Sequence, residues 1–195
     1  MKRLLLVRHG ETEWSAAGRH TSRTDVPLTP RGEELARALG RRLRELHLAP
    51  AACLSSPRGR AVDTARLAGL GDGLAIDERL RELGYGEYEG RTTVEIRSER
   101  PDWDLFRDGC PGGETLAQAG RRADDLLAAL APEEGQGDVA LVGHGHFSRI
   151  LAARYVRLGP EWARCLALGT ASLSLLAHEH EWRAVVLWND QPGPD

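Results

Sequence analysis

Three short apolar segments constrain the fold of this chain more than any other feature of its sequence. Residues 4–7, 51–55 and 139–143 are almost continuously apolar, which is typical of parallel strands buried on both faces of a sheet. Residues 74–76 form a shorter segment of the same kind. Helical patterns lie between these segments, and strands that alternate with helices predict a mainly parallel sheet covered on both faces. We therefore expect a three-layer α/β/α fold.

The predicted helices begin at recognisable signals. Thr29 and Pro30 have the order of an N-cap and a first-turn proline, and leucines follow at the spacing of one helical face. Similar patterns predict three further helices over residues 57–67, 116–130 and 147–158.

The last part of the chain departs from this alternation. Residues 172–177 and 184–188 flank a polar stretch, which predicts an antiparallel hairpin at the edge of the sheet. Edge strands of this kind offer a surface for a homodimer. Residues 189–195 are rich in Pro and Gly and are expected to form a loose tail. Without an internal repeat or a low-complexity linker, the sequence predicts one domain over residues 1–195.

Composition argues against several classes of protein. The 195 residues are 41% hydrophobic and 28% charged, as in a globular chain with one sizeable core. A formal charge of −3 argues against a nucleic-acid partner. The three cysteines are widely spaced and form no CxxC pair, which favours a reduced, cytoplasmic setting over a zinc site or a disulfide framework. The apolar run at the start of the chain is too short for a signal peptide or a membrane span.

Polar residues follow each of the three main strands. Arg8 and His9 come after the first, the sequence SSPRGR at 55–60 ends the second, and His144 comes after the third. Because the carboxyl ends of parallel strands meet at one edge of a sheet, these side chains are expected to share a crevice. Two histidines and two or three arginines would then face one ligand.

Such a set suits phosphoryl transfer, in which negative charge spreads over the oxygens of the transferred group. Arg8, Arg58 and His144 could surround these oxygens. A neutral His9 would attack phosphorus and form a covalent intermediate. A leaving alkoxide needs a proton, and Glu82 lies where the chain should return to the same edge of the sheet. This scheme needs no metal or other cofactor.

Five sequence blocks carry a family resemblance: LVRHGETEW, DVPLTPRG, SSPRGRAVDTA, LRELGYGEYEG and LVGHGH. Their order resembles that of the histidine phosphatase superfamily, also called phosphoglycerate mutase-like, and they span most of the chain. The resemblance implies the phosphoglycerate mutase-like fold. It also implies that His9 is phosphorylated, that Arg8, Arg58 and His144 bind phosphate, and that Glu82 donates the proton.

Three further segments, EWSAAGRHTSRTDVPLT, PDWDLFRDGCPGGET and HGHFSR, are similar to a small-phosphatase branch of this family. The branch includes fungal sedoheptulose-1,7-bisphosphatase and actinobacterial acid phosphatases. The similarity implies that Ser15, Thr21 and Ser22 line the pocket through hydroxyls and backbone amides. It also implies that Tyr85 and Arg149 reach the distal part of the substrate, where they could hold a second phosphate. Serines stand at positions 15 and 22, where many members carry asparagine and glycine respectively. The candidate substrate-binding residues are Ser15, Thr21, Ser22, Tyr85, Gly145 and Arg149.

Other interpretations stay open for several residues. Two carboxylates near Glu82 are alternative proton donors, Glu87 and Glu89. Two histidines fit a structural role as well as a ligand-binding one, His20 and His146. Two arginines are interpreted as surface or helix-face residues, Arg23 and Arg60.

Three functions are compatible with this candidate site. The first is a phosphomonoesterase that hydrolyses small phosphorylated metabolites such as sugar phosphates. The second is a phosphoglycerate mutase-type enzyme, in which the phosphohistidine returns its phosphoryl group to the product instead of water. The third is a non-catalytic module that binds phosphorylated ligands. Dedicated mutases of the resembling family are longer and carry an extra insertion, so the short chain favours the phosphomonoesterase.

Overall fold

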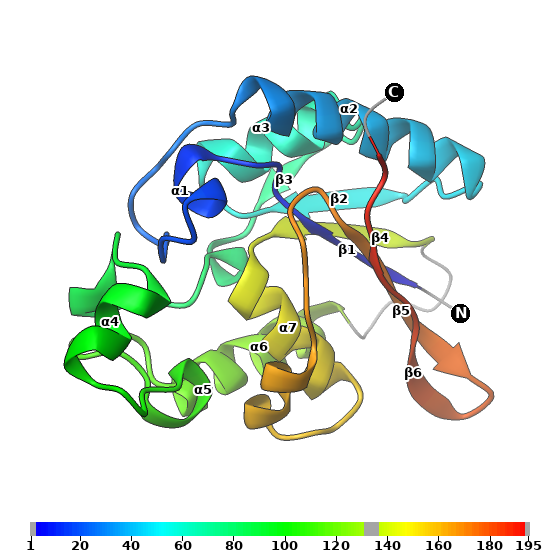
Figure 1. Ribbon diagram of the computed structural model, residues 1–195. Helices are drawn as coiled ribbons and strands as arrows, with labels where there is room; N and C mark the ends of the chain where they lie inside the picture. The colour runs from blue at the N-terminus through cyan, green and yellow to red at the C-terminus, as the bar shows by residue number, and fades with distance from the viewer. Residues whose placement is uncertain (1–2, 131–136, 194–195) are drawn as a thin grey trace.

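The computed structural model describes residues 3–130 and 137–193. A six-stranded sheet with the order β3-β2-β4-β1-β5-β6 forms its centre (Figure 1). Four strands run parallel, namely β1 (Leu4–Arg8), β2 (Ala52–Ser55), β3 (Ala75–Ile76) and β4 (Val139–Gly143). The antiparallel edge is the hairpin of β5 (Leu173–Glu179) and β6 (Trp182–Asp190). The prediction of a mainly parallel sheet with an antiparallel C-terminal edge is confirmed.

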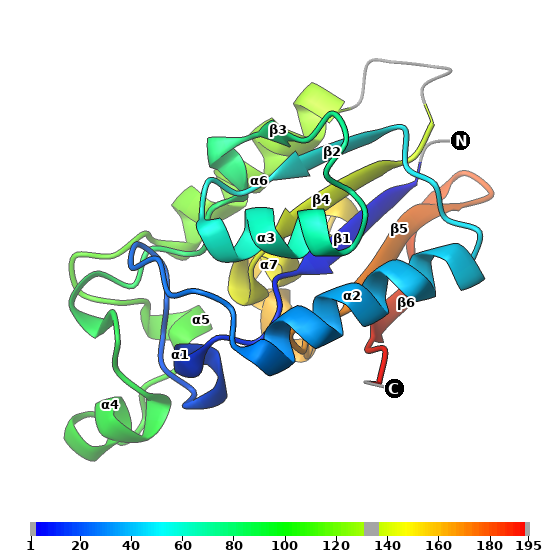
Figure 2. The ribbon, with the colours of Figure 1, turned by 90° about the horizontal axis from the view of Figure 1, so that it is seen from above.

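Helices cover both faces of this sheet, as Figures 1 and 2 show. Helices α2 (Pro30–Glu45) and α3 (Gly59–Leu67) lie on one face, and α6 (Leu116–Leu130) and α7 (Gly145–Tyr155) lie on the other. The three-layer arrangement is therefore confirmed. The shorter elements are α1 (Glu13–Ala16), η1 (Glu78–Leu80), η2 (Gly86–Tyr88), α4 (Thr93–Glu99), α5 (Leu105–Asp108) and η3 (Pro160–Cys165).

The two covered faces explain why the strand segments are apolar without alternation. Along β1, Leu4 and Leu6 belong to a hydrophobic cluster with α6 and α7, whereas Leu5 and Val7 belong to a second cluster with α2 and α3. All four side chains are buried. Successive strand residues point to opposite faces, so both sets must be apolar when both faces are covered.

Most helix and strand ends lie within about two residues of their predicted positions. Thr29 caps α2 by accepting a hydrogen bond from the Gly32 N–H (3.0 Å), as expected. Helix α7 begins at Gly145, two residues earlier than predicted. The expectation of a loose tail from residue 189 is wrong for Asn189 and Asp190, which belong to β6. The tail expected at residues 194–195 lies outside the described residues.

Side-chain and backbone contacts explain why β6 extends this far. The backbone N–H of Asn189 donates to Ser174 Oγ (3.0 Å), and Arg42 Nε donates to Asp190 Oδ2 (2.8 Å). These partners come from β5 and α2, so the sequence around position 189 alone gave no sign of them.

Candidate active site

Two histidines meet at the carboxyl end of the sheet because they follow neighbouring strands. His9 follows β1 and His144 follows β4, and the register pairs Arg8 with Gly143. The two rings lie edge to face with their centroids 5.1 Å apart. Both side chains are buried, with 4% of His9 and none of His144 exposed. Residues 135 positions apart in the chain are thus brought into one pocket, as the strand-end argument predicts.

The hydrogen bond of His9 fixes which ring nitrogen is free. Nδ1 lies 2.7 Å from the carbonyl oxygen of Gly10. A carbonyl oxygen only accepts, so Nδ1 carries the proton and Nε2 keeps its lone pair. Burial, followed by the charges of Arg8 and Arg60, holds the pKa of His9 well below its usual range. The imidazole is therefore neutral at physiological pH and can act as a nucleophile through Nε2.

Arg8 adds a guanidinium whose Nε is buried without a hydrogen-bond partner among the described residues. Its Nη1 donates to the carbonyl oxygen of Leu168. Gly145 lies against the guanidinium, and a Cβ at that position would stand 3.3 Å from the Nε and Cζ of Arg8. The absence of a side chain at Gly145 lets the first turn of α7 approach the arginine.

Arg60 is a residue whose place the sequence interpretation missed. It is completely buried, so its interpretation as a surface or helix-face arginine is wrong. Its guanidinium donates to the carbonyl oxygens of Thr24 (2.8 Å) and Thr21 (3.3 Å), and its Nε has no partner among the described residues. Arg60 precedes Thr64 by one helical turn and Thr64 is also buried, so both residues lie on the covered face of α3.

His144 presents a third unpaired polar atom. Its Nε2 lies 2.7 Å from Ser56 Oγ, and its Nδ1 is buried with no partner in the described part of the chain. Burial and the charges around it, including those of Arg60 and Arg8, hold the pKa of His144 well below its usual range. Buried polar atoms without partners are rare in proteins, so the unpaired atoms of Arg8, Arg60 and His144 indicate a ligand near His9.

Glu82 borders the same pocket with a buried carboxylate. Its Oε1 accepts from the backbone N–H groups of Leu83 and Phe147 (2.8 Å each), and its Oε2 accepts from that of His146 (3.0 Å). The alternative donor Glu89 accepts from the backbone N–H groups of Ser22 and Thr24 and does not line the cavity of His9. Among the carboxylates that the sequence left open, Glu82 is the one that lines the cavity with His9.

Aromatic and hydroxyl side chains form the wall of this cavity, which has a volume of about 230 Å³. The Tyr85 hydroxyl lies 2.6 Å from Nδ1 of His146, and the His20 ring lies 4.8 Å from the Tyr85 ring. Burial raises the pKa of Tyr85 well above its usual range, so the phenol keeps its proton. Arg149 lines the cavity too, but its Nε donates to the Ala163 carbonyl (3.0 Å). The two histidines with open interpretations thus both face the cavity.

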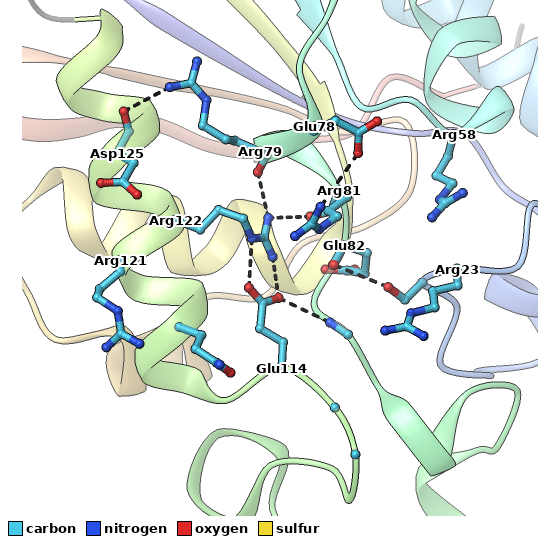
Figure 3. Close-up of a pocket in the computed structure, with 15 residues that line it drawn as sticks. Arg23, Arg58, Glu78, Arg79, Arg81, Glu82, Glu114, Arg121, Arg122 and Asp125 are labelled. Atoms are coloured by element: carbon cyan, nitrogen blue, oxygen red, sulfur yellow. Dashed lines mark hydrogen bonds and ion pairs between the residues drawn. The ribbon is translucent and has the colours of Figure 1, made fainter.

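The remaining predicted residues divide between two cavities. Ser15, Thr21 and Gly145 line the cavity of His9. The Ser15 hydroxyl is also engaged with Thr12 at the start of α1. Ser22 and Arg58 instead line a second, larger cavity that Glu82 also borders (Figure 3). The roles predicted for these residues stay predictions.

Residues 3–130 and 137–193 contain neither a metal-binding cluster nor a membrane-spanning helix. No three His, Cys, Asp or Glu side chains are grouped there in a way that could hold a metal ion. No helix in this part of the chain has the length and hydropathy needed to cross a membrane.

The fold and the pocket together define a class of protein, an α/β protein with paired histidines and arginines for an oxyanion at the carboxyl end of its sheet. Residues 4–191 match the histidine phosphatase superfamily (branch 1), and the chain belongs to this family.

Named relatives and solved structures agree with this assignment. An acid phosphatase of Mycobacterium tuberculosis is 44% identical over 188 residues, covering 95% of this chain and 91% of that one. Sedoheptulose 1,7-bisphosphatase of Saccharomyces cerevisiae is 37% identical over 186 residues, covering 80% and 68%. A solved structure of an open reading frame product from M. tuberculosis superposes with a TM-score of 0.93 at 42% identity, covering 98% of this chain and 99% of that one.

Proposed function

We propose that this protein is a phosphomonoesterase that hydrolyses small phosphorylated metabolites through a phosphohistidine at His9. The neutral His9 carries this proposal, because its ring lies beside that of His144 and under the charges of Arg8 and Arg60, whose Nε groups have no partner among the described residues. The non-bridging oxygens of a phosphoryl group are suitable acceptors for these donors. The relatives named acid phosphatase and sedoheptulose 1,7-bisphosphatase support the same substrate class.

The first chemical step transfers the phosphoryl group to the protein. His9 Nε2 forms a bond to phosphorus as the bond from phosphorus to the leaving oxygen breaks. In this proposal the proton that the leaving oxygen needs comes from the carboxyl of Glu82. Arg8, Arg60 and His144 stabilise the charge on the phosphoryl oxygens during this transfer.

The second step returns the protein to its starting state. The Glu82 carboxylate takes a proton from a water molecule while the water oxygen bonds to phosphorus. The phosphorus–nitrogen bond breaks, inorganic phosphate leaves, and His9 is neutral again. A mutase would differ only here, because a second substrate hydroxyl would replace the water.

Turnover of an aryl phosphate in the presence of a chelator tests the proposal. We expect wild type to release inorganic phosphate, His9→Ala to lose at least about a thousandfold in turnover, and the exposed-site control His178→Ala to match wild type. Circular dichroism verifies that each variant is folded. Equal turnover by wild type and a folded His9→Ala protein would refute the mechanism. Transfer of the phosphoryl group to 3-phosphoglycerate with little free phosphate would favour the mutase instead.

We also infer a cytoplasmic setting and a homodimer. The three cysteines are free, which suits a reducing compartment. Strand β6 is at the edge of the sheet and exposes Trp182 (68%) and Val186 (48%), an apolar surface that a second copy could cover. Light scattering after size exclusion tests the dimer, and we expect Val186→Glu to convert it to a monomer. A monomeric wild-type protein would refute the dimer.

A further inference from the structure

A second cavity, with a volume of about 960 Å³, adjoins Glu82 (Figure 3). Glu82 lines both cavities. The hydroxyl of Ser22 donates to the Glu82 carbonyl oxygen (3.4 Å). The loop of residues 22–23 therefore contacts the segment that follows η1. The second cavity therefore adjoins the candidate proton donor.

Arginines dominate the lining of this cavity, with six arginines against four carboxylates. Two of the arginines have strong structural partners. Arg122 makes a bidentate ion pair with Glu114 (2.6 and 2.9 Å), and Arg79 makes one with Asp77 (shortest contact 2.6 Å). These two guanidiniums hold α6 and η1 in place.

Three of the other arginines lack a comparable partner. Arg81 reaches only the exposed Glu78 at 3.8 Å, a contact that contributes little. Arg23 and Arg58 make no ion pair with any described residue, and the Nε of Arg58 is buried without a hydrogen bond. In Figure 3 the guanidiniums of Arg23, Arg58 and Arg81 surround the space beside Glu82, whereas Arg121 on α6 points away from it.

We propose that Arg23, Arg58 and Arg81 form a second binding site, for an oxyanion of the phosphate type. Three guanidiniums that share one cavity repel one another, and a dianion with several acceptor oxygens would replace this repulsion with charge-assisted hydrogen bonds. The Glu78 contact of Arg81 is long and exposed, so a bound phosphate would displace it readily.

Occupation of this site would couple to the candidate active site through the backbone. Arg81 directly precedes Glu82, and Arg23 directly follows Ser22, whose hydroxyl contacts the Glu82 carbonyl. An anion bound to both arginines would hold these two segments together and restrain Glu82. The bound group could be the second phosphate of a bisphosphate substrate or a free anion. The substrate alternative depends on the proposed phosphatase function, whereas the site itself does not.

Arginine side-chain NMR tests the site directly, without relying on turnover. Inorganic phosphate is titrated into ¹⁵N-labelled protein while the Nε–H signals of the arginines are followed. We expect the signals of Arg23 and Arg81 to shift and saturate, and the double variant Arg23→Gln/Arg81→Gln to raise the phosphate dissociation constant at this site at least about tenfold, as followed at Arg58. Arg121→Gln, a matched exposed arginine of the same cavity, should behave as wild type.

The titration distinguishes failure of the second site from failure of the proposed phosphatase function. Absence of a saturable shift at Arg23 and Arg81 would overturn the second site, whether or not the protein hydrolyses phosphate esters. A site that saturates in a protein without turnover would support the second site and refute the proposed function. If the protein both binds phosphate at this site and hydrolyses phosphate esters, steady-state kinetics identify the source of the anion. A rise in the KM of a sugar bisphosphate relative to an aryl monophosphate in the double variant assigns it to the substrate, and an unchanged ratio assigns it to a free anion.

Discussion

Three histidines with lowered pKa make a quantitative prediction about acid stability. Burial holds the pKa of His9, His144 and His146 well below the ordinary value of 6.5. In the unfolded chain these side chains take up a proton as the pH falls through 6.5, whereas in the folded protein they stay neutral. The unfolded state therefore binds more protons, and the free energy of unfolding must fall on acidification.

The magnitude follows from the number of histidines involved. Between pH 7 and pH 5.5, each histidine that stays neutral in the folded state lowers the free energy of unfolding by about 1.2 kcal/mol. The three together lower it by about 4 kcal/mol, which is a large part of the 5–15 kcal/mol that is typical of a domain. Carboxylates with lowered pKa, such as Asp77 and Asp138, have ordinary values of 3.8 and titrate below this interval.

Urea unfolding followed by tryptophan fluorescence at pH 7.0, 6.5, 6.0 and 5.5 measures this dependence. In the variant His146→Phe the phenyl ring would pack against Tyr85 and Phe106. Because one of the three histidines is then absent, we expect the fall in the free energy of unfolding between pH 7 and pH 5.5 to be smaller by about a third. An unfolding free energy that is equal at pH 7 and pH 5.5, or higher at pH 5.5, would refute the reasoning.

Three further predictions concern single side chains. Glu82→Gln should lower kcat/KM for alkyl phosphates about a hundredfold but for p-nitrophenyl phosphate less than about tenfold, because the nitrophenolate leaves without a proton. Equal losses for the two substrates would contradict the role of Glu82 as proton donor. Gly145→Ala places a Cβ 3.3 Å from the Arg8 guanidinium, and aryl phosphate turnover should fall about tenfold with little change in melting temperature; unchanged turnover would contradict the packing argument. Arg60→Met removes a charged donor from the Thr24 carbonyl and should lower the free energy of unfolding by about 3 kcal/mol, measured in urea at pH 7.5; a loss below about 1 kcal/mol would show that these bonds contribute little.

Local patterns in the sequence predicted the strands, the edge of the sheet that holds the site and the start of one helix. Apolar segments without alternation predicted buried parallel strands, because both faces of such strands need apolar side chains. The rule that parallel strands end at one edge then predicted that His9 and His144 would meet. Thr29 and Pro30 gave the start of α2 because capping depends on neighbours within one turn.

The residues that were misplaced or missed depend on contacts distant in sequence. Arg60 looks like a surface arginine until the 21–24 loop folds over it and supplies carbonyl acceptors. Tyr85 and His146 become partners only because the fold brings the residue before η2 beside the first turn of α7. Asn189 and Asp190 look like the start of a loose tail until β5 and α2 provide partners for them.

The sequence by itself determined the layers of the fold, the nucleophile candidate and the edge of the sheet where the site lies. Only the tertiary structure decided the protonated nitrogen of His9, the burial of Arg60 and the division of the arginines between two cavities. The physical reason is that periodicity and capping report on forces within a few residues. Protonation and hydrogen-bond partners are instead set by burial and charges that the fold brings together from distant segments.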